Sequence, residues 1–181
     1  MSIQPLEAER LHLAQLLEAV QRCGFHMHAS ARKLPWPLSG GFLHARRKDT
    51  ELYEAMSAFN ERFAKLQDTL GAAMRHAALL MGEVTSPFLR VLALFEKLGV
   101  IESVAAWQLG RTARNLAAHD YDTDYAVIAE HFNQLNALRP AILATASRLM
   151  AVCRSDLGIH AATDDFSSEF QTVLAETGVA A

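Results

Sequence analysis

The chain has 181 residues, a formal net charge of −3, about half of its residues hydrophobic and a fifth charged, which excludes an intrinsically disordered chain and predicts a single core. No apolar run approaches the ~20 residues that cross a bilayer, and the N-terminus lacks the pattern of a signal peptide, so we expect a cytoplasmic protein without membrane contact. The negative charge gives no general attraction to nucleic acid, so any RNA contact must depend on a local basic patch.

The first part of the sequence predicts a helix followed by a long loop. Leucines and a valine recur at helical spacing, and Gly24 is a suitable stop, which places the first helix over about 4–22. Prolines, a glycine pair and the absence of a sustained period then predict a loop over 23–48.

The middle of the sequence predicts two more helices. Asp49 is a good N-cap, and the apolar residues after it alternate at spacings of four and three, which indicates one long helix over about 50–81. A shorter helix follows over about 87–98, where Gly99 can adopt the left-handed conformation that ends a helix.

The last part continues the helical pattern. A helix that contains Trp107 ends near residue 119, and the next runs over about 124–153, where Pro140 should kink or divide it. No strand pattern or internal repeat occurs. The sequence therefore predicts an all-α fold, an antiparallel up-and-down bundle of four to five helices with a long loop after the first. The single domain covers 1–155, and the tail over 156–181 is expected to be weakly ordered with one short helix over 167–176.

Polar side chains gather in RTARNLAAHDYDTDY, residues 111–125. At ~100° per residue, Arg111, Asn115 and His119 fall in one stripe of a helix, whereas Arg114 points ~140° away from His119. The two residues can converge only if the helix unwinds near its end or if two copies of the chain pair about a two-fold axis. The second arrangement predicts a homodimer.

The segment RNLAAHDY, residues 114–121, resembles the R-x4-H-x-Y signature of HepT-like toxins in the HEPN superfamily of all-helical proteins. FNERFAKLQDTLG and LFEKLGVIES are also similar to that family's pattern, so the resemblance covers about 52–150. It implies a HEPN-type bundle and a dimeric, metal-independent RNA endonuclease that is the toxin of a type VII-like toxin–antitoxin pair. It also implies Arg114 and His119 as catalytic residues, without a cofactor. The implied partner is a minimal nucleotidyltransferase antitoxin, which can adenylylate the motif tyrosine, here Tyr121.

The residues present suit this chemistry. RNA cleavage without a metal needs a base for the ribose 2′-hydroxyl, an acid for the leaving oxygen and a cation for the phosphorane charge. A histidine near a helix C-terminus and an arginine that grips phosphate supply these groups. Supporting and RNA-binding candidates are Asn115, Arg111, Arg46, Arg47 and Lys48.

The motif residues also allow other interpretations. An arginine and a histidine near a helix C-terminus are most often solvated residues that the helix dipole favours. A competing interpretation is a non-catalytic subunit that binds substrate for a separate nucleotidyltransferase, and a third is a scaffold dimer. Cys23, His26 and His28 have a loose metal-like spacing, but no fourth ligand accompanies them, so no metal site is expected.

Overall fold

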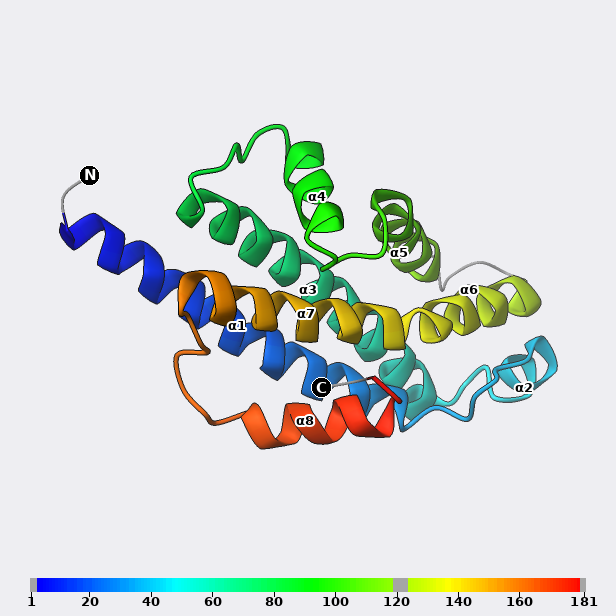
Figure 1. Cartoon of the computed structure of the whole chain (residues 1–181). Coiled ribbons are helices and arrows are strands. Elements are labelled where there is room, and N and C mark those ends of the chain that lie inside the picture. Colours follow the sequence, from blue (N-terminus) through cyan, green and yellow to red (C-terminus); the bar gives the residue numbers. More distant parts are fainter. Residues whose placement is uncertain (1–2, 119–123, 180–181) are drawn as a thin grey trace.

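The computed structural model describes residues 3–118 and 124–179, which form eight α-helices and no β-strand (Figure 1). The helices are α1 (Ile3–Ala31), α2 (Gly40–Ala45), α3 (Thr50–Leu80), α4 (Phe88–Lys97), α5 (Val104–Ala117), α6 (Tyr125–Ala137), α7 (Arg139–Leu157) and α8 (Ser167–Glu176). The all-α class predicted from the sequence is confirmed. The expected bundle of four to five helices was too small, because α2 was not predicted, the predicted short helix over 167–176 packs on the bundle as α8, and one predicted helix is divided. Within the described ranges, no helix is both long and apolar enough to span a bilayer.

α1 and α3 form a long antiparallel pair through the bundle, most of the other helices pack on this pair, and α2 packs on α6 (Figure 1). The Asp49 carboxylate caps α3 by accepting a hydrogen bond from the Leu52 amide at 3.1 Å, as the sequence predicted. α4 and α5 pack on α3, α7 packs on both long helices, and α8 packs on α1 and α7. The predicted apolar stripe of α3 is buried except for the half-buried Leu80 at its end, and its buried members are Leu52, Met56, Phe59, Phe63, Leu66, Leu70, Ala73 and Ala77.

The prediction that the first helix stops at Gly24 was wrong, because α1 continues to Ala31. The added turns bury Met27 and Ala31 in the core, which outweighs the ~1 kcal/mol that one helical glycine costs. Gly24 lies where α1 meets α8, and a Cβ atom added there would lie 2.7 Å from Cε2 of Phe170. The glycine therefore allows a close approach between two helices.

The predicted loop over 23–48 is consequently much shorter than expected. Only residues 32–39 connect α1 to α2, and 46–49 connect α2 to α3. Trp36 closes the end of α1, since its Nε1 donates a hydrogen bond to the Ala31 carbonyl at 2.7 Å. The Asn133 side chain of α6 accepts from the Leu38 amide at 2.8 Å and donates to the Leu38 carbonyl at 2.9 Å. Side chains from the bundle thus hold this connection in place.

The helices after α3 begin and end close to the predicted positions. Gly99 has a φ of +71° just after α4, and Asp124 caps α6 by accepting from the Ala126 amide at 2.9 Å. Pro140 lies in the first turn of α7, and the predicted helix over 124–153 is divided at Leu138 into α6 and α7. A proline at this position needs no amide partner, so it is compatible with a new helix start.

The C-terminal segment packs more closely on the bundle than the weakly ordered tail that we expected. α8 covers the predicted 167–176, and its Phe170 is buried against the core. His28 Nδ1 accepts a hydrogen bond from Arg139 Nη1 at 3.0 Å, so the proton of the neutral ring is on Nε2, 2.7 Å from Glu176 Oε2. The hydrogen bond from His28 lowers the pKa of Glu176. The end of α8 is therefore tied to α1 and, through His28, to α7.

Gly24→Ala should lower the free energy of unfolding by about 1–3 kcal/mol, because the new methyl group collides with the Phe170 ring. A glycine-to-alanine change inside a helix usually has the opposite sign. Urea unfolding measures the difference. Gly41→Ala in α2 is the control, since no atom lies within 4 Å of its added Cβ, and it should be neutral or stabilising. Stabilisation by both changes would show that Phe170 does not pack on Gly24.

Candidate functional site

α5, the helix that leads into the RNLAAHDY motif, is attached to α3 by a set of contacts that we call the α3–α5 seam. It consists of Trp107, Gly110 and Arg114 on α5 and Ala64, Gln67 and Asp68 on α3. In its centre the buried Gln67 Nε2 donates a hydrogen bond to the Trp107 carbonyl at 2.9 Å. A Cβ atom added at Gly110 would lie 3.0 Å from this nitrogen, so the glycine lets the two helices approach closely.

Arg114, a predicted catalytic residue, lies in this seam. Its Nη1 donates hydrogen bonds to the Ala64 carbonyl at 2.9 Å and to Asp68 Oδ1 at 2.8 Å, and its side chain is only 12% exposed. Nε and Nη2 make no hydrogen bond within the described part of the chain. The guanidinium is therefore fixed in position by α3 with one edge unused.

The other predicted residues of the motif differ in their positions. Asn115 and Arg111 are exposed on α5, and Arg111 has no hydrogen bond or ion pair among the described residues. His119 and Tyr121 lie outside the described residues. Arg111 and Arg114 are about 60° apart around α5, and their surroundings differ, since Arg114 contacts α3 and Arg111 is exposed.

The basic run before α3, predicted to contact RNA, has local partners. Arg46 forms an ion pair with Asp49, the capping residue of α3. Arg47 Nη1 donates a hydrogen bond to the His44 carbonyl at 2.9 Å, near the end of α2. Lys48 is exposed. Two of these three cations therefore stabilise the connection between α2 and α3.

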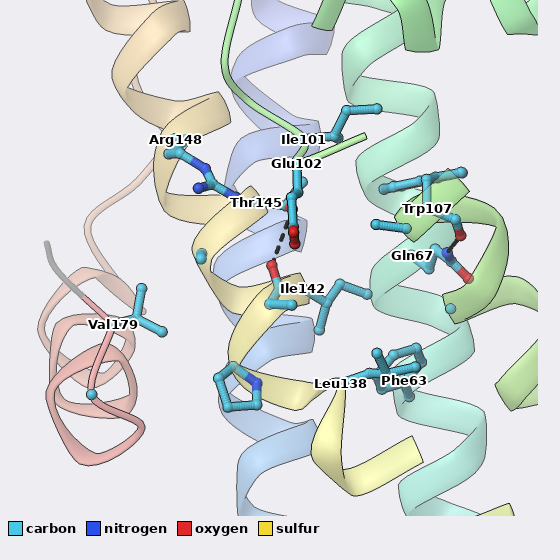
Figure 2. Close-up of a pocket in the computed structure, with 16 residues that line it drawn as sticks. Phe63, Gln67, Ile101, Glu102, Trp107, Leu138, Ile142, Thr145, Arg148 and Val179 are labelled. Atoms are coloured by element: carbon cyan, nitrogen blue, oxygen red, sulfur yellow. Dashed lines mark hydrogen bonds between the residues drawn. The ribbon is translucent and has the colours of Figure 1, made fainter. Parts of the chain in front are cut away.

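Two cavities flank the seam, and Gln67 and Trp107 contribute to the walls of both. The first, of about 490 Å³, lies between α3, α5 and α7. Figure 2 shows Thr145 and Arg148 on α7 across this cavity from Trp107 and Gln67. Its wall is mainly apolar, and Arg148 already donates a hydrogen bond to the Val100 carbonyl at 3.0 Å.

The second cavity, which we call the cationic cavity, has a volume of about 500 Å³ and lies between α1, α3, α4 and α5. Gly71 leaves room for it, because a Cβ atom there would approach Cζ of Phe88 to 3.3 Å. The Arg75 guanidinium lies 5.1 Å from the centroid of the Phe88 ring. The titratable residues that line the cavity come from three helices and are His12, Asp68, Arg75, His76 and Arg111.

The two histidines of the cationic cavity form one of its walls. The rings of His12 and His76 meet edge to face, with their centroids 4.7 Å apart. His76 Nε2 lies 2.8 Å from Glu9 Oε2 and 2.9 Å from the Glu9 carbonyl oxygen. His76 is thus oriented by α1, and His12 is exposed beside it.

The pairing of charges distinguishes the cationic cavity from its neighbours. Asp68 is the one carboxylate that the described part of the chain contributes to it, and this group is paired with Arg114 of the seam. Arg75 and Arg111 form no ion pair with the described residues. Two arginines therefore face this cavity without an opposing free carboxylate.

A larger cavity of about 890 Å³ beside α2 has a different balance of charge. Its arginines already have partners, since Arg32 is paired with Glu176 and Arg62 donates to the His26 carbonyl and to Ser30. Lys33, Glu51 and Glu54 also line this cavity, and none of them forms an ion pair with a described residue. Arg46 also lines this cavity, but it is paired with Asp49. The cavity therefore offers no excess of positive charge.

The sequence prediction missed His12, Arg75 and His76. One signal for them exists in GAAMRH on α3, where small residues precede an arginine and a histidine inside a long amphipathic helix. Asp68, Gly71 and Arg75 follow at spacings of three and four, so they share one face of the helix. His12 carries no such signal, since it joins the cavity only through the packing of α1 on α3.

Comparison of the chain with protein-family models, curated proteins and solved structures finds no match. Among the described residues, no group of three His, Cys, Asp or Glu side chains is arranged to hold a metal ion. Burial raises the pKa of Cys153 to about 12, and burial also raises the pKa of Cys23. Both thiols therefore lack the thiolate character of a nucleophile.

Proposed function

We propose that this chain is a metal-independent RNA endonuclease of the HepT-like, HEPN kind, which acts as a homodimer and is the toxin of a toxin–antitoxin pair. The observation that carries the proposal is the exposed face of α5, because this face leads directly into the RNLAAHDY motif. The fixed position of Arg114 at the last turn of the same helix supports it.

The exposed face of α5 suits contact with a second copy of the chain. Leu109 and Leu116 are 56% and 37% exposed. They lie seven residues apart, about 20° from each other around the helix, so they form one apolar strip. α5 lies at the edge of the bundle (Figure 1). A two-fold pairing along this strip would bury both leucines of each protomer.

A dimer also resolves the spacing within the motif. Arg114 faces α3, and on a regular helix His119 would point ~140° away from it. With two copies, His119 of one protomer takes the 2′-hydroxyl proton while the 2′-oxygen attacks phosphorus. His119 of its partner protonates the departing 5′-oxygen, leaving a 2′,3′-cyclic phosphate and a free 5′-hydroxyl. In this mechanism, the Nε and Nη2 donors of Arg114 would balance the phosphorane charge.

The proposed partner is a minimal nucleotidyltransferase antitoxin. Transfer of AMP from ATP to the Tyr121 hydroxyl, with release of pyrophosphate, would add negative charge and bulk beside the motif and so exclude RNA. Intact mass after co-expression with such an enzyme reports the modification, and Tyr121→Phe should abolish the added mass.

One observation favours a second function, a non-catalytic subunit that presents substrate to a nucleotidyltransferase. The ion pair between Arg114 and Asp68 already gives the arginine a structural role. Under this alternative the motif stabilises α5 and its exposed face binds the enzyme. RNA cleavage by the chain alone separates the two functions.

His119→Ala should abolish RNA cleavage and relieve growth arrest when the chain is expressed without a partner, while the melting temperature stays unchanged. The measurements are RNA integrity in cells and cleavage of RNA by purified protein. EDTA should have no effect, because the proposed base, acid and cation are all side chains. Cleavage that survives His119→Ala, or that EDTA abolishes, contradicts the mechanism. A wild type that neither cleaves RNA nor arrests growth supports the non-catalytic function.

Replacing Leu109 and Leu116 together by glutamate should convert the dimer into a folded monomer and abolish cleavage, because four buried carboxylates would face each other across the pairing. Light scattering measures the mass, and circular dichroism measures the fold. Leu89→Glu on α4 is the control, since Leu89 is 59% exposed but lies outside α5, and it should leave the dimer intact. A wild-type monomer, or a dimer that survives the double change, would rule out this interface.

A further inference from the structure

We propose that the cationic cavity is a phosphate-binding subsite for single-stranded RNA, with Arg75 and Arg111 as the groups that bind the phosphate. The inference rests on the proposed function for its substrate class. It assigns an RNA contact to α1, α3 and α5, away from the basic run before α3.

The charges around the cationic cavity favour an anionic ligand. Arg75 and Arg111 come from two helices, face one cavity and have no ion pair among the described residues. Among the described residues, Asp68 is the only carboxylate that lines the cavity, and Arg114 neutralises it from outside. Two unopposed guanidinium groups at one cavity form a site for a phosphate oxyanion, because guanidinium binds phosphate through paired N–H groups.

The packing of the helices orients the two arginines before a ligand binds. The Phe88 ring lies under the Arg75 guanidinium at 5.1 Å, which restricts the side chain without using its hydrogen-bond donors. Arg111 projects from α5, and α5 is fixed on α3 by the seam. Both donors are therefore carried by elements that are packed together before RNA arrives.

The cationic cavity has room for a phosphate group. A volume of about 500 Å³ lies in the range of pockets that enclose small ligands, so the cavity can admit a phosphate with its sugar. Gly71 and Ala72 line the cavity with minimal side chains, and the exposed His12 lines it as a further donor. The cavity accepts one nucleotide of a strand.

The cavity also stays open in the proposed dimer. At ~100° per residue, Arg111 lies ~140–160° around α5 from Leu116 and Leu109. A partner that covers the leucine strip leaves the arginine uncovered. A strand bound at the motif can therefore continue around the edge of α5 toward the cationic cavity.

The test is binding of a short fluorescent single-stranded RNA to the dimeric His119→Ala protein, measured by anisotropy at several salt concentrations. Arg75→Gln and Arg111→Gln, each added to this background, should weaken binding by about ten- to a hundredfold. Each should also reduce the slope of log K against log salt by about 0.7, the value for one lost phosphate contact on a single strand. Arg154→Gln is the control, an exposed arginine of α7 that lines a different cavity, and it should change neither quantity.

Inorganic phosphate, titrated at constant ionic strength, distinguishes the source of the ligand. Displacement of RNA that depends on Arg75 and Arg111 shows that the site binds the phosphate group itself. If phosphate does not displace the RNA, but Arg75 and Arg111 are still needed for RNA binding, the site recognises the RNA strand and not the free phosphate group. Unchanged affinity and salt slope in both variants overturns the inference, as does a wild-type protein that does not bind RNA.

The failure of this subsite is distinguishable from failure of the proposed function. If the wild type cleaves RNA and His119→Ala does not, but both arginine variants bind normally, the ribonuclease stands and the subsite is wrong. If no cleavage occurs but both arginines are needed for binding, the cavity binds RNA for a non-catalytic subunit. Unchanged melting temperatures of the variants exclude loss of fold as the cause.

Discussion

The hydrogen bond from Gln67 to the Trp107 carbonyl is the contact on which the arrangement of both cavities depends. Gln67 is buried, and a buried amide without a partner costs about 1–3 kcal/mol, so this bond selects one position of α5 on α3. Gly110 lets the helices come close enough to form it. Because Gln67 and Trp107 line both cavities, any shift of α5 would reshape the two together. Gln67 Oε1 and Trp107 Nε1 are buried without a hydrogen-bond partner among the described residues. The shared wall of the cavities therefore has one acceptor and one donor whose hydrogen bonds are not made.

The two arginines of α5 have different surroundings for a simple geometric reason. Arg114 is on the side of the helix that faces α3, where it binds Asp68 and the Ala64 carbonyl. Arg111 is at the edge of the exposed side, where it faces the cationic cavity. By neutralising Asp68, Arg114 leaves the positive charge of Arg75 and Arg111 unopposed. A chain with a net charge of −3 can in this way present a local anion site, and the motif arginine contributes to it without touching the anion.

Local signals in the sequence predicted much of the fold, and tertiary packing decided the rest. Asp49, Asp124 and Pro140 act within one helical turn, so helix starts and the division of α6 from α7 were predictable. Gly24 carries the same local signal as a helix stop, but its role depends on Phe170, which is 146 positions away in the sequence. The ~140° angle between Arg114 and His119 stays a prediction, because His119 lies outside the described residues. The cationic cavity was not predictable, because its charged residues come from three helices and no single segment contains the pattern.

The unfolding free energies of Arg114→Ala and Arg111→Ala, compared under identical conditions, test the central role of the seam most directly. Arg114→Ala removes the hydrogen bond to the Ala64 carbonyl and the pair with Asp68, so it should destabilise the protein by about 1–2 kcal/mol. Arg111→Ala removes an exposed side chain without a described partner and should stay within about 0.5 kcal/mol of wild type. Native-state hydrogen exchange should show the loss in the Arg114 variant concentrated in α5. Equal stabilities of the two variants, with unchanged exchange in α5, would contradict the account.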